Sequence, residues 1–469
     1  MQTKDVFSNA GLFLLGVALQ LPVTSHAQSV ILPANPTPNQ ASLAAHLQNV
    51  CTQLAAAADS VGGLTAPQRD LLSGCQLFQD PQTPGATLAA AYTAVLGQQI
   101  NALGPQTKKF GSLQQDNLAA RLAELRRGVR GSKTAGLVLR GDDGPISASS
   151  GNLGDYLPGG GSGDGNVQFL DGRLGVFING SVKVGSKRKT NNSDAFDIND
   201  DTLTIGADYR VGERFVFGAA FGSGKLKTDF GSALGRLDLK SKGFSVYASF
   251  YGESYYVDVL AGYGKPTLET SRHIGFSGLP GGGSVDQWAI GSTHTKDLWT
   301  GISVGNSFHW RAWTATPEAS INFHEIQLDG FSESMSAPGA PGAGFALTYN
   351  DAVVPSLQMR AGIRISYTWT TPFGVIEPNF HGSYIRERRD RSDAFYGHLS
   401  NAPAGLSGPG SSLVLNTDSP EGHYFANGGG MNFQFTHGIS GFVDYEQLKT
   451  LKSIKSHEFS FGVRYQFGS

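Results

Sequence analysis

The sequence has little charge, little cysteine and no long apolar run after its first segment. Only 16% of its 469 residues are charged and the formal net charge is −2, whereas soluble domains average about 25% charged residues. This balance gives no reason to expect a nucleic-acid partner. Because no later run of about 18 apolar residues occurs, a transmembrane helix is excluded there. If the chain lies in a membrane, it must cross it as a closed barrel of strands.

Catalytic and metal-binding patterns are also missing or out of context. The 11 histidines show neither H-x-H nor H-E-x-x-H spacing, so we expect no zinc site. Gly301–Gly305 fits G-x-S-x-G, yet it lies inside a predicted strand, where Ser303 would only face a barrel interior. Segment 197–201 lacks the glycine and closing glutamate of a calcium loop, and the glycine run 159–165 has no flanking strand and helix. We therefore expect no cofactor and no enzyme activity, while activity in the N-terminal region stays an open alternative.

Glycine is abundant, at 63 residues, roughly twice the usual share of about 7%, which suits tight turns and crowded interiors. From Gly172 to the end, apolar and polar residues alternate with a period of two, which indicates β-strands. In the final stretch every second residue from Phe459 to Phe467 is apolar or aromatic. We predict about twelve strands, over residues 173–184, 201–210, 214–227, 236–251, 255–270, 295–310, 312–326, 355–369, 373–387, 422–435, 439–449 and 457–467.

The connections between these strands alternate in length. Short turns are predicted at residues 211–214, 251–254, 310–312, 370–373 and 436–439. Long loops are predicted around residues 186–200, 229–235, 271–295, 329–354 and 390–421. Short turns at one end and long loops at the other are typical of outer-membrane barrels, and a soluble sandwich has no reason to sort its loops in this way. The sequence therefore predicts an all-β transmembrane barrel of about twelve antiparallel strands.

The two faces of the predicted strands differ as a membrane barrel requires. One face is aliphatic and aromatic, for example at Leu203, Phe217 and Ile302. The other carries charges that would each cost several kcal/mol in a dry core unless paired, but that are tolerated in a hydrated lumen. The side chains that we predict to be charged and to face the lumen are Glu318, Arg360, Arg364, Glu377, Asp444 and Arg464.

The N-terminus fits a secretory signal peptide. An apolar core from Ala10 to Leu21 precedes a small-x-small triplet that ends at Ala27, so we expect cleavage between Ala27 and Gln28. An ordinary buried helix is the alternative. Export would place the chain in an oxidising compartment, where its two cysteines, Cys51 and Cys75, are expected to form a disulfide; two unpaired core cysteines are the alternative.

A helical region and a linker separate the signal peptide from the strands. Residues 41–130 show the three- and four-residue apolar spacing of helices, with helices expected over 41–59, 66–78, 86–103 and 113–128. A disulfide would join the first two. Residues 131–170 are rich in Gly and Ser and show no apolar period. We divide the chain into a signal peptide (1–27), a helical N-terminal domain (28–130), a linker (131–170) and a barrel (171–469).

The strand-rich part resembles the translocator β-domain of autotransporters, the type V secretion barrels of Gram-negative bacteria. The resemblance rests on the twelve-strand count, a Glu-Pro pair within a strand at 377–378, the YEQ of 445–447, and the closing Gly462-x-x-Tyr465-x-Phe467. Family members usually end on the aromatic residue, whereas Gly468 and Ser469 follow here.

The resemblance implies an outer-membrane barrel that anchors or translocates a short helical passenger. It implies that Gly462, Tyr465 and Phe467 form an assembly signal read by the barrel-assembly machinery, with periplasmic chaperones and outer-membrane lipid as further partners. A surface-exposed hydrolase or adhesin anchored by the barrel, and a passive pore, are the alternatives. The sequence names no surface ligand.

The family also places an α-helix inside the pore, before the first strand. The helix that ends near Gly131 is a candidate, and its arginines would meet carboxylates in the lumen. However, residues 131–172 separate this helix from the first strand, so the solvated end of an amphipathic helix is an equal alternative. The N-terminal domain could accordingly lie at the surface, in the pore or in the periplasm.

Overall fold

The computed structural model describes most of the chain after the predicted signal peptide. The described residues are 29–59, 63–97, 99, 102–130, 138–141, 144–147, 173–231, 234–279, 281–388, 394–418, 422–435, 439–449 and 453–466. The predicted cleavage site at Ala27 and Gln28 lies outside them, as does Phe467. None of the described helices is both long enough and apolar enough to cross a membrane.

Four helices occupy the N-terminal part: α1 (Pro38–Ala58), α2 (Ala66–Gln79), α3 (Gly85–Val95) and α4 (Leu103–Arg130). The first two begin at reciprocal caps. Thr37 accepts a hydrogen bond from the backbone of Gln40, whose side chain accepts one from the backbone of Thr37. Thr65 and Gln68 repeat this arrangement in α2. Each capping box satisfies two backbone donors that would otherwise lack a partner.

The C-terminal part forms a closed barrel of twelve antiparallel strands, which confirms the predicted fold class. The barrel strands are β3 (Leu174–Lys187), β4 (Phe196–Val211), β5 (Phe215–Asp229), β6 (Gly235–Tyr251), β7 (Tyr255–Gly264), β9 (Gly283–Asn306), β11 (Trp313–Leu328), β15 (Ala352–Tyr367), β17 (Gly374–Arg388), β20 (His423–Phe435), β21 (Ile439–Lys449) and β22 (Ile454–Gln466). The last strand, β22, pairs with the first, β3, so the sheet has no free edge at this seam.

Shorter strands extend or cover the barrel. β8 (Thr267–Leu279) forms a hairpin with β9. β10 (Phe308–Trp310) and β16 (Trp369–Thr371) follow β9 and β15 along the chain and pair with β11 and β17. β12 (Phe331–Ser332), β14 (Leu347–Tyr349), β18 (Ala394–Leu399) and β19 (Leu413–Asn416) form a separate four-stranded sheet. β13 (Ser334–Met335) pairs with β9, and η3 (Ala343–Phe345) is a 3-10 turn. In the predicted linker, β1 (Val138–Gly141) and β2 (Gly144–Ser147) form a hairpin.

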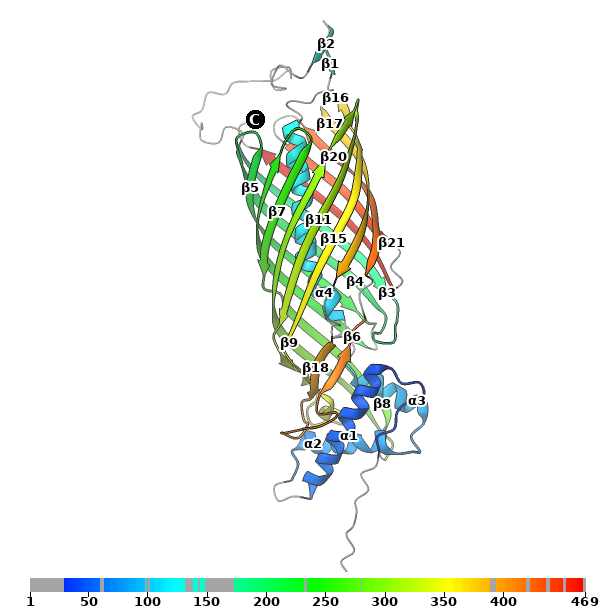
Figure 1. The fold of residues 1–469 in the computed structure, drawn as a ribbon. Coiled ribbons are helices and arrows are strands. Elements are labelled where there is room, and N and C mark those ends of the chain that lie inside the picture. The colour runs from blue at the N-terminus through cyan, green and yellow to red at the C-terminus, as the bar shows by residue number, and fades with distance from the viewer. Residues whose placement is uncertain are drawn as a thin grey trace, which may run out of the picture.

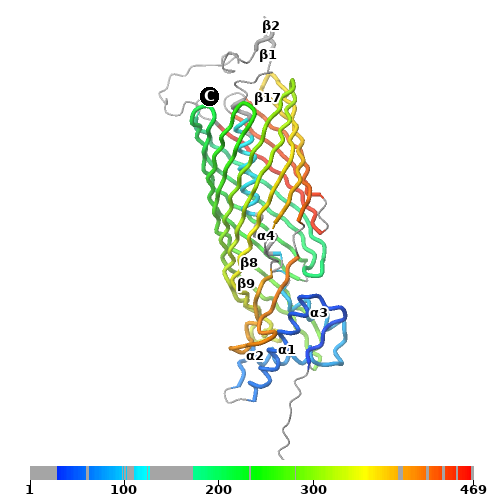
Figure 2. Tube along the Cα trace, viewed as in Figure 1, coloured from blue at the N-terminus to red at the C-terminus, as the bar shows by residue number. Residues whose placement is uncertain are grey.

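The barrel has two unlike ends, which we call the short-turn end and the long-connection end (Figure 1). The chain ends at the short-turn end. The helices α1, α2 and α3 lie at the opposite, long-connection end, beside β8 and β18, and the tube in Figure 2 shows the same arrangement. α4 runs inside the barrel between the two ends. α4 is therefore the pore helix, and the alternative of a solvated helix end is wrong.

The outward face of the barrel is apolar, as the alternation predicts. Large side chains on it remain exposed, such as Ile205 at 52% and Phe461 at 50%. Near the short-turn end this face carries a girdle of exposed aromatic rings, which suits a membrane interface. The rings include Phe215, Phe250, Tyr255, Trp310, Trp313, Tyr367, Trp369, Phe435 and Tyr465.

Several predicted boundaries and loops were wrong. The loop expected at 271–295 is the β8–β9 hairpin, and the loops at 329–354 and 390–421 contain β12, β14, β18 and β19. These segments pack on the N-terminal helices, which supply the contacts that a free loop would lack. The helix expected to reach residue 103 ends at Val95, before Gly97 with a φ of 60°. α4 begins at Leu103 instead of residue 113.

The orientation of β22 gives a prediction about lipid exposure. Replacing Phe461 by Arg places a cation on the outward face, and we expect a loss of about 2–4 kcal/mol in barrel stability. The matched control is Ser460→Arg, one residue away, where the side chain lines a cavity that also holds Asp444 and Glu446. Folded barrel is measured by heat-modifiable migration and by urea unfolding in micelles. Equal losses in the two variants would contradict the assigned faces.

Candidate functional site

The pore helix α4 makes polar contacts with the barrel wall along much of its length. The backbone N–H of Gly111 donates to Asp297 at 3.1 Å, and Gln115 donates to the carbonyl of Thr300 at 3.0 Å. Asn117 donates to Thr204 at 3.0 Å. The wall groups in these three contacts belong to β4 and β9, and Asn179 of β3 also donates to the carbonyl of Asn117 at 3.0 Å. α4 is thus fixed to one wall of the lumen instead of standing free in its centre.

The strongest of these contacts is a buried ion pair. Nε of Arg121 donates to Oδ2 of Asp208 at 2.9 Å, and the side chain of Arg121 has no exposed surface. The guanidinium also lies 5.0 Å from the ring centre of Phe177. Removing one partner of such a pair leaves an uncompensated charge and typically costs about 3–5 kcal/mol. Arg464 of β22 approaches the same carboxylate at 3.8 Å.

A second arginine anchors α4 nearer the short-turn end. Arg126 pairs with Asp258, which also accepts a hydrogen bond from Ser249 at 2.6 Å. The guanidinium lies 3.6 Å from the ring centre of Tyr256, whose hydroxyl donates to Glu318 at 3.1 Å. Arg121 and Arg126 therefore meet carboxylates of the lumen, as the resemblance implied.

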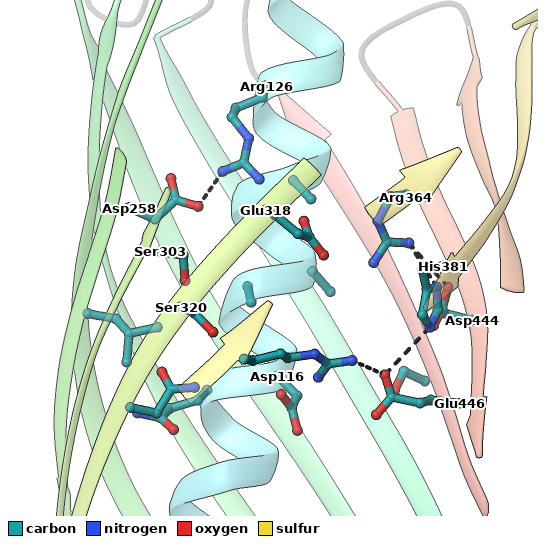
Figure 3. A pocket seen from close by; sticks show the side chains of 18 of the residues that line it. Asp116, Arg126, Asp258, Ser303, Glu318, Ser320, Arg364, His381, Asp444 and Glu446 are labelled. Carbon is teal, nitrogen blue, oxygen red and sulfur yellow. Dashed lines mark hydrogen bonds and ion pairs between the residues drawn. The ribbon is translucent and has the colours of Figure 1, made fainter. Parts of the chain in front are cut away.

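On the other side of α4 the lumen is charged and hollow (Figure 3). A cavity of about 180 Å³ is lined by small α4 side chains, Ala119, Ala120 and Ala123, and by the opposite wall. On that wall Arg360 pairs with Glu446, and Arg364 lies 3.8 Å from Asp444. The charges of this wall are therefore compensated mainly within the wall itself.

The predicted lumen residues can now be placed. Glu318, Arg360, Arg364 and Asp444 line the cavity. Arg464 is buried beside Asp208, as described above. Glu377 lies two residues from the buried Asn379 in β17, on the same inward side of the strand. Of the residues predicted to form an assembly signal, Tyr465 is 45% exposed on the outward face. Gly462 is inward, and an added Cβ would lie 2.2 Å from Oδ1 of Asn179.

Inward glycines make room for α4 on the wall that it contacts. A Cβ added at Gly224, Gly243 or Gly264 would lie 3.0–3.2 Å from the ring of Phe110, which is fully buried and stacks edge-on against Trp299. Gly111 approaches the wall so closely that its own Cβ would lie 3.1 Å from Asp297. Part of the high glycine content thus forms the seat of α4.

At the long-connection end, α1 to α3 and the connections form one structure, which we call the cap (residues 29–97, 267–295 and 329–351 with 394–418). Cys51 and Cys75 join α1 to α2 through a disulfide with a Cα–Cα distance of 5.8 Å. Phe78 of α2 packs edge-on against Phe345, and Asp70 accepts hydrogen bonds from the backbone N–H groups of Gly342 and Gly344. The helices and the connections therefore share a core.

One stripe of α1 binds the edge of the four-stranded sheet. Oδ1 of Asn39 accepts the N–H of Asn416 at 2.7 Å, and Oγ of Ser42 accepts the N–H of Val414 at 2.8 Å. Nδ1 of His46 lies 2.8 Å from the carbonyl of Gly410, while Nε2 accepts the N–H of Leu399 at 3.0 Å. Asn39 and Ser42 thus supply hydrogen bonds that a neighbouring strand would give to β19, so the edge is not left open. His46 binds the end of β18 and the loop before β19.

Arg272 is the central contact of the cap. It is fully buried, pairs with the equally buried Glu333, and donates to the carbonyls of Ala94 at the end of α3 (2.9 Å) and of Phe345 (3.1 Å). Glu333 in turn accepts the N–H of Leu347 at 2.8 Å. One guanidinium therefore joins α3, the β8–β9 hairpin and the connection 329–351.

Sequence reasoning missed Arg272, Glu333 and the α1 stripe. The spacing of Asn39, Ser42 and His46, three and four residues apart, is a signal for a polar helix face, but not for its partner. Ser303, the serine of the G-x-S-x-G pattern, lines the lumen cavity in mid-strand opposite Ser320. Within the described residues no group of three or more His, Cys, Asp or Glu is arranged to hold a metal ion.

Comparison with known proteins relates this chain to one family. Residues 176–446 match the profile of the autotransporter beta-domain. A similar solved structure is the translocator domain of the autotransporter NalP from Neisseria meningitidis, at 18% identity and a TM-score of 0.47, covering 64% of this chain and 90% of that one. Another is the beta domain of the Bordetella autotransporter BrkA, at 16% identity and a TM-score of 0.44, covering 63% and 100%. No curated protein sequence matches the chain.

The two ring nitrogens of His46 give a pH prediction for the cap. Burial lowers the pKa of His46 from 6.5, and the neighbouring His398 lowers it further, although the hydrogen bond to Gly410 opposes this. Protonation would place an N–H of the ring against the N–H of Leu399. Because the unfolded chain takes up this proton first, the contribution of His46 to stability is full above about pH 6.5 and is lost as the pH falls below it toward the lowered pKa.

We therefore expect the unfolding temperature of the cap, measured by calorimetry in detergent, to fall between pH 7.5 and pH 5. In His46→Gln, which keeps a donor and an acceptor but does not titrate, this fall should be smaller. An equal fall in both proteins would show that His46 does not titrate in this way.

Proposed function

Because the chain belongs to the autotransporter beta-domain family, we propose that it displays its N-terminal helices on the cell surface as a cap that stays attached to the barrel. The barrel itself is an outer-membrane autotransporter β-barrel, and the helices are its short passenger. In this proposal the long-connection end faces the outside of the cell. The passenger is retained and is not released into the medium.

The observation that carries the proposal is the shared core of the cap. Leu71 and Phe78 are fully buried in contact with a connection of the barrel. Arg272 is buried between α3 and Glu333, and α1 binds the edge of β19. Release of the helices would expose these apolar surfaces and would remove the carbonyls of Ala94 and Val95, to which the buried Arg272 donates at 2.9 and 3.2 Å. Leaving a buried donor without a partner typically costs about 1–3 kcal/mol. A passenger built to leave its barrel would be expected to have a core of its own.

The direction of α4 supports the same orientation. Gly111 lies against Asp297, toward the long-connection end, and Arg126 lies against Asp258, near the start of β7 at the short turn. The chain therefore passes from the cap through the lumen to the short-turn end, where β3 begins. The alternative of a passive pore has less support, because α4 occupies the lumen and the cap covers its long-connection end.

We extend the proposal to partners and activity. The assembly machinery and periplasmic chaperones would recognise the last strand before it closes the seam with β3, and lipid would cover the apolar face. We propose no catalytic role for the chain. Ser303 supports this view, because it lies in mid-strand without the strained turn that exposes a nucleophilic serine.

Surface display gives a direct prediction. An epitope tag placed before Val30 should be stained on intact cells, and the protein in the membrane fraction should be a single chain that contains both the tag and the barrel. A tag inserted at Gly212, in a short turn, is the matched control and should be stained only after the outer membrane is permeabilised. A cap tag hidden in intact cells, or a tagged fragment in the medium, would contradict the proposal.

A further inference from the structure

Three lysines form a row across adjacent strands at the long-connection end. Lys242 lies in β6, Lys265 directly follows β7, and Lys296 lies in β9. The N–H of Lys265 donates to the carbonyl of Lys242 at 3.0 Å. On the other side, Gly264 pairs with Asp297, and the N–H of Thr295 donates to Pro266 at 2.8 Å. Lys265 therefore lies between Lys242 and Lys296 in register.

The row lies just beyond the apolar band of the barrel. On each strand the lysine is two residues from a large outward side chain, and side chains two residues apart share a face. These side chains are Phe244, Tyr263 and Leu298, which are 54%, 41% and 46% exposed. The three lysines are themselves exposed. Their ammonium groups are thus held where the hydrocarbon of a membrane gives way to headgroups.

The charges of the row are not neutralised by the protein. Within the described part of the chain, none of the three ammonium groups has a hydrogen bond or an ion pair, whereas Lys240 on the same face is paired with Glu269 at 2.9 Å.

A second pair of lysines adds positive charge beside the row, because Lys240 lies directly opposite Lys225 on β5. Side chains directly opposite each other on adjacent strands are about 4.5–5.5 Å apart at Cβ, and like charges there are destabilising. A row of this kind is stabilised when an anion lies against it.

We propose that Lys242, Lys265 and Lys296 bind the phosphate groups of lipopolysaccharide in the outer leaflet of the membrane. The position at the headgroup level and the three ammonium groups without an ion pair fit a multiply phosphorylated lipid. Lysine ammonium groups bind phosphate as compact point charges on flexible stems, so the row can adapt to the headgroup. The choice of the outer leaflet rests on the orientation given under the proposed function. The charge of the row and its position on the barrel do not depend on that orientation.

The test uses the full mature chain refolded in a zwitterionic detergent, with fluorescent lipopolysaccharide and anisotropy as the readout. Replacing all three lysines by Gln should weaken binding by about 100-fold, from the usual effect of each cation near an anionic surface. Replacing all three by Arg should restore binding. The matched control removes three exposed cations from the short-turn end, Arg173→Gln, Arg214→Gln and Arg311→Gln, and should bind like the wild type. Heat-modifiable migration checks that each variant is folded.

Chemically dephosphorylated lipopolysaccharide identifies the group that is bound. The wild type should bind it as weakly as the Gln variant binds the intact lipid, and salt should weaken only the phosphate-dependent part. Equal binding of intact lipid by the wild type and the Gln variant would overturn the proposal, as would undiminished binding of the dephosphorylated lipid. Preference for phosphatidylglycerol over lipopolysaccharide would also overturn it, and would point to the inner leaflet and hence against the proposed orientation. Binding as expected, together with release of the tagged cap into the medium, would leave this site standing while the proposed retention of the cap failed.

Discussion

The structure depends on the pairing of α4 with the wall of the lumen. The barrel turns Asp208 and Asp258 inward, and Arg121 and Arg126 of α4 neutralise them. Without the helix these carboxylates would face a water-filled pore. The space that Phe110 fills beside Gly224, Gly243 and Gly264 would then be empty. Because Gly111 contacts Asp297 toward the long-connection end and Arg126 contacts Asp258 near the short-turn end, the chain before α4 leaves the barrel at the long-connection end. The position of the N-terminal helices follows from this constraint.

The N-terminal helices and the connections of the barrel share one core in the cap. The helices α1 to α3 are a small unit, and their apolar faces are covered by the connections of the barrel, with Phe345 and Arg272 at the centre. The connections in turn depend on the helices. Asn39 and Ser42 of α1 bind the edge of β19, and His46 binds Leu399 at the end of β18. Passenger and barrel are therefore one folding unit at this end of the molecule, although their sequences show different periods.

The sequence predicted the barrel well because period-two alternation and loop sorting are local signals. Arg360 and Asp444 could be assigned to the lumen by parity alone, and the pairing of Cys51 with Cys75 followed from compartment and helix spacing. The sequence could not decide whether α4 lies in the pore or ends in solvent. The arginines of α4 indicate a position in the pore only when the carboxylates that they pair with are known. Arg272 and Glu333 are 61 residues apart, and no local pattern links them. Connections that read as free loops became strands only because the helices pack on them.

The most direct test of this account cuts the chain between cap and pore helix. A protease site is inserted in the α3–α4 connection, between Gly97 and Leu103, and intact cells are treated with the matching protease. The account predicts that the fragment from residue 28 to the cut stays bound to the cells through the shared core and leaves only under denaturing conditions. Release of the fragment into the medium after cutting would show that the cap is held by the chain alone, and would contradict the account.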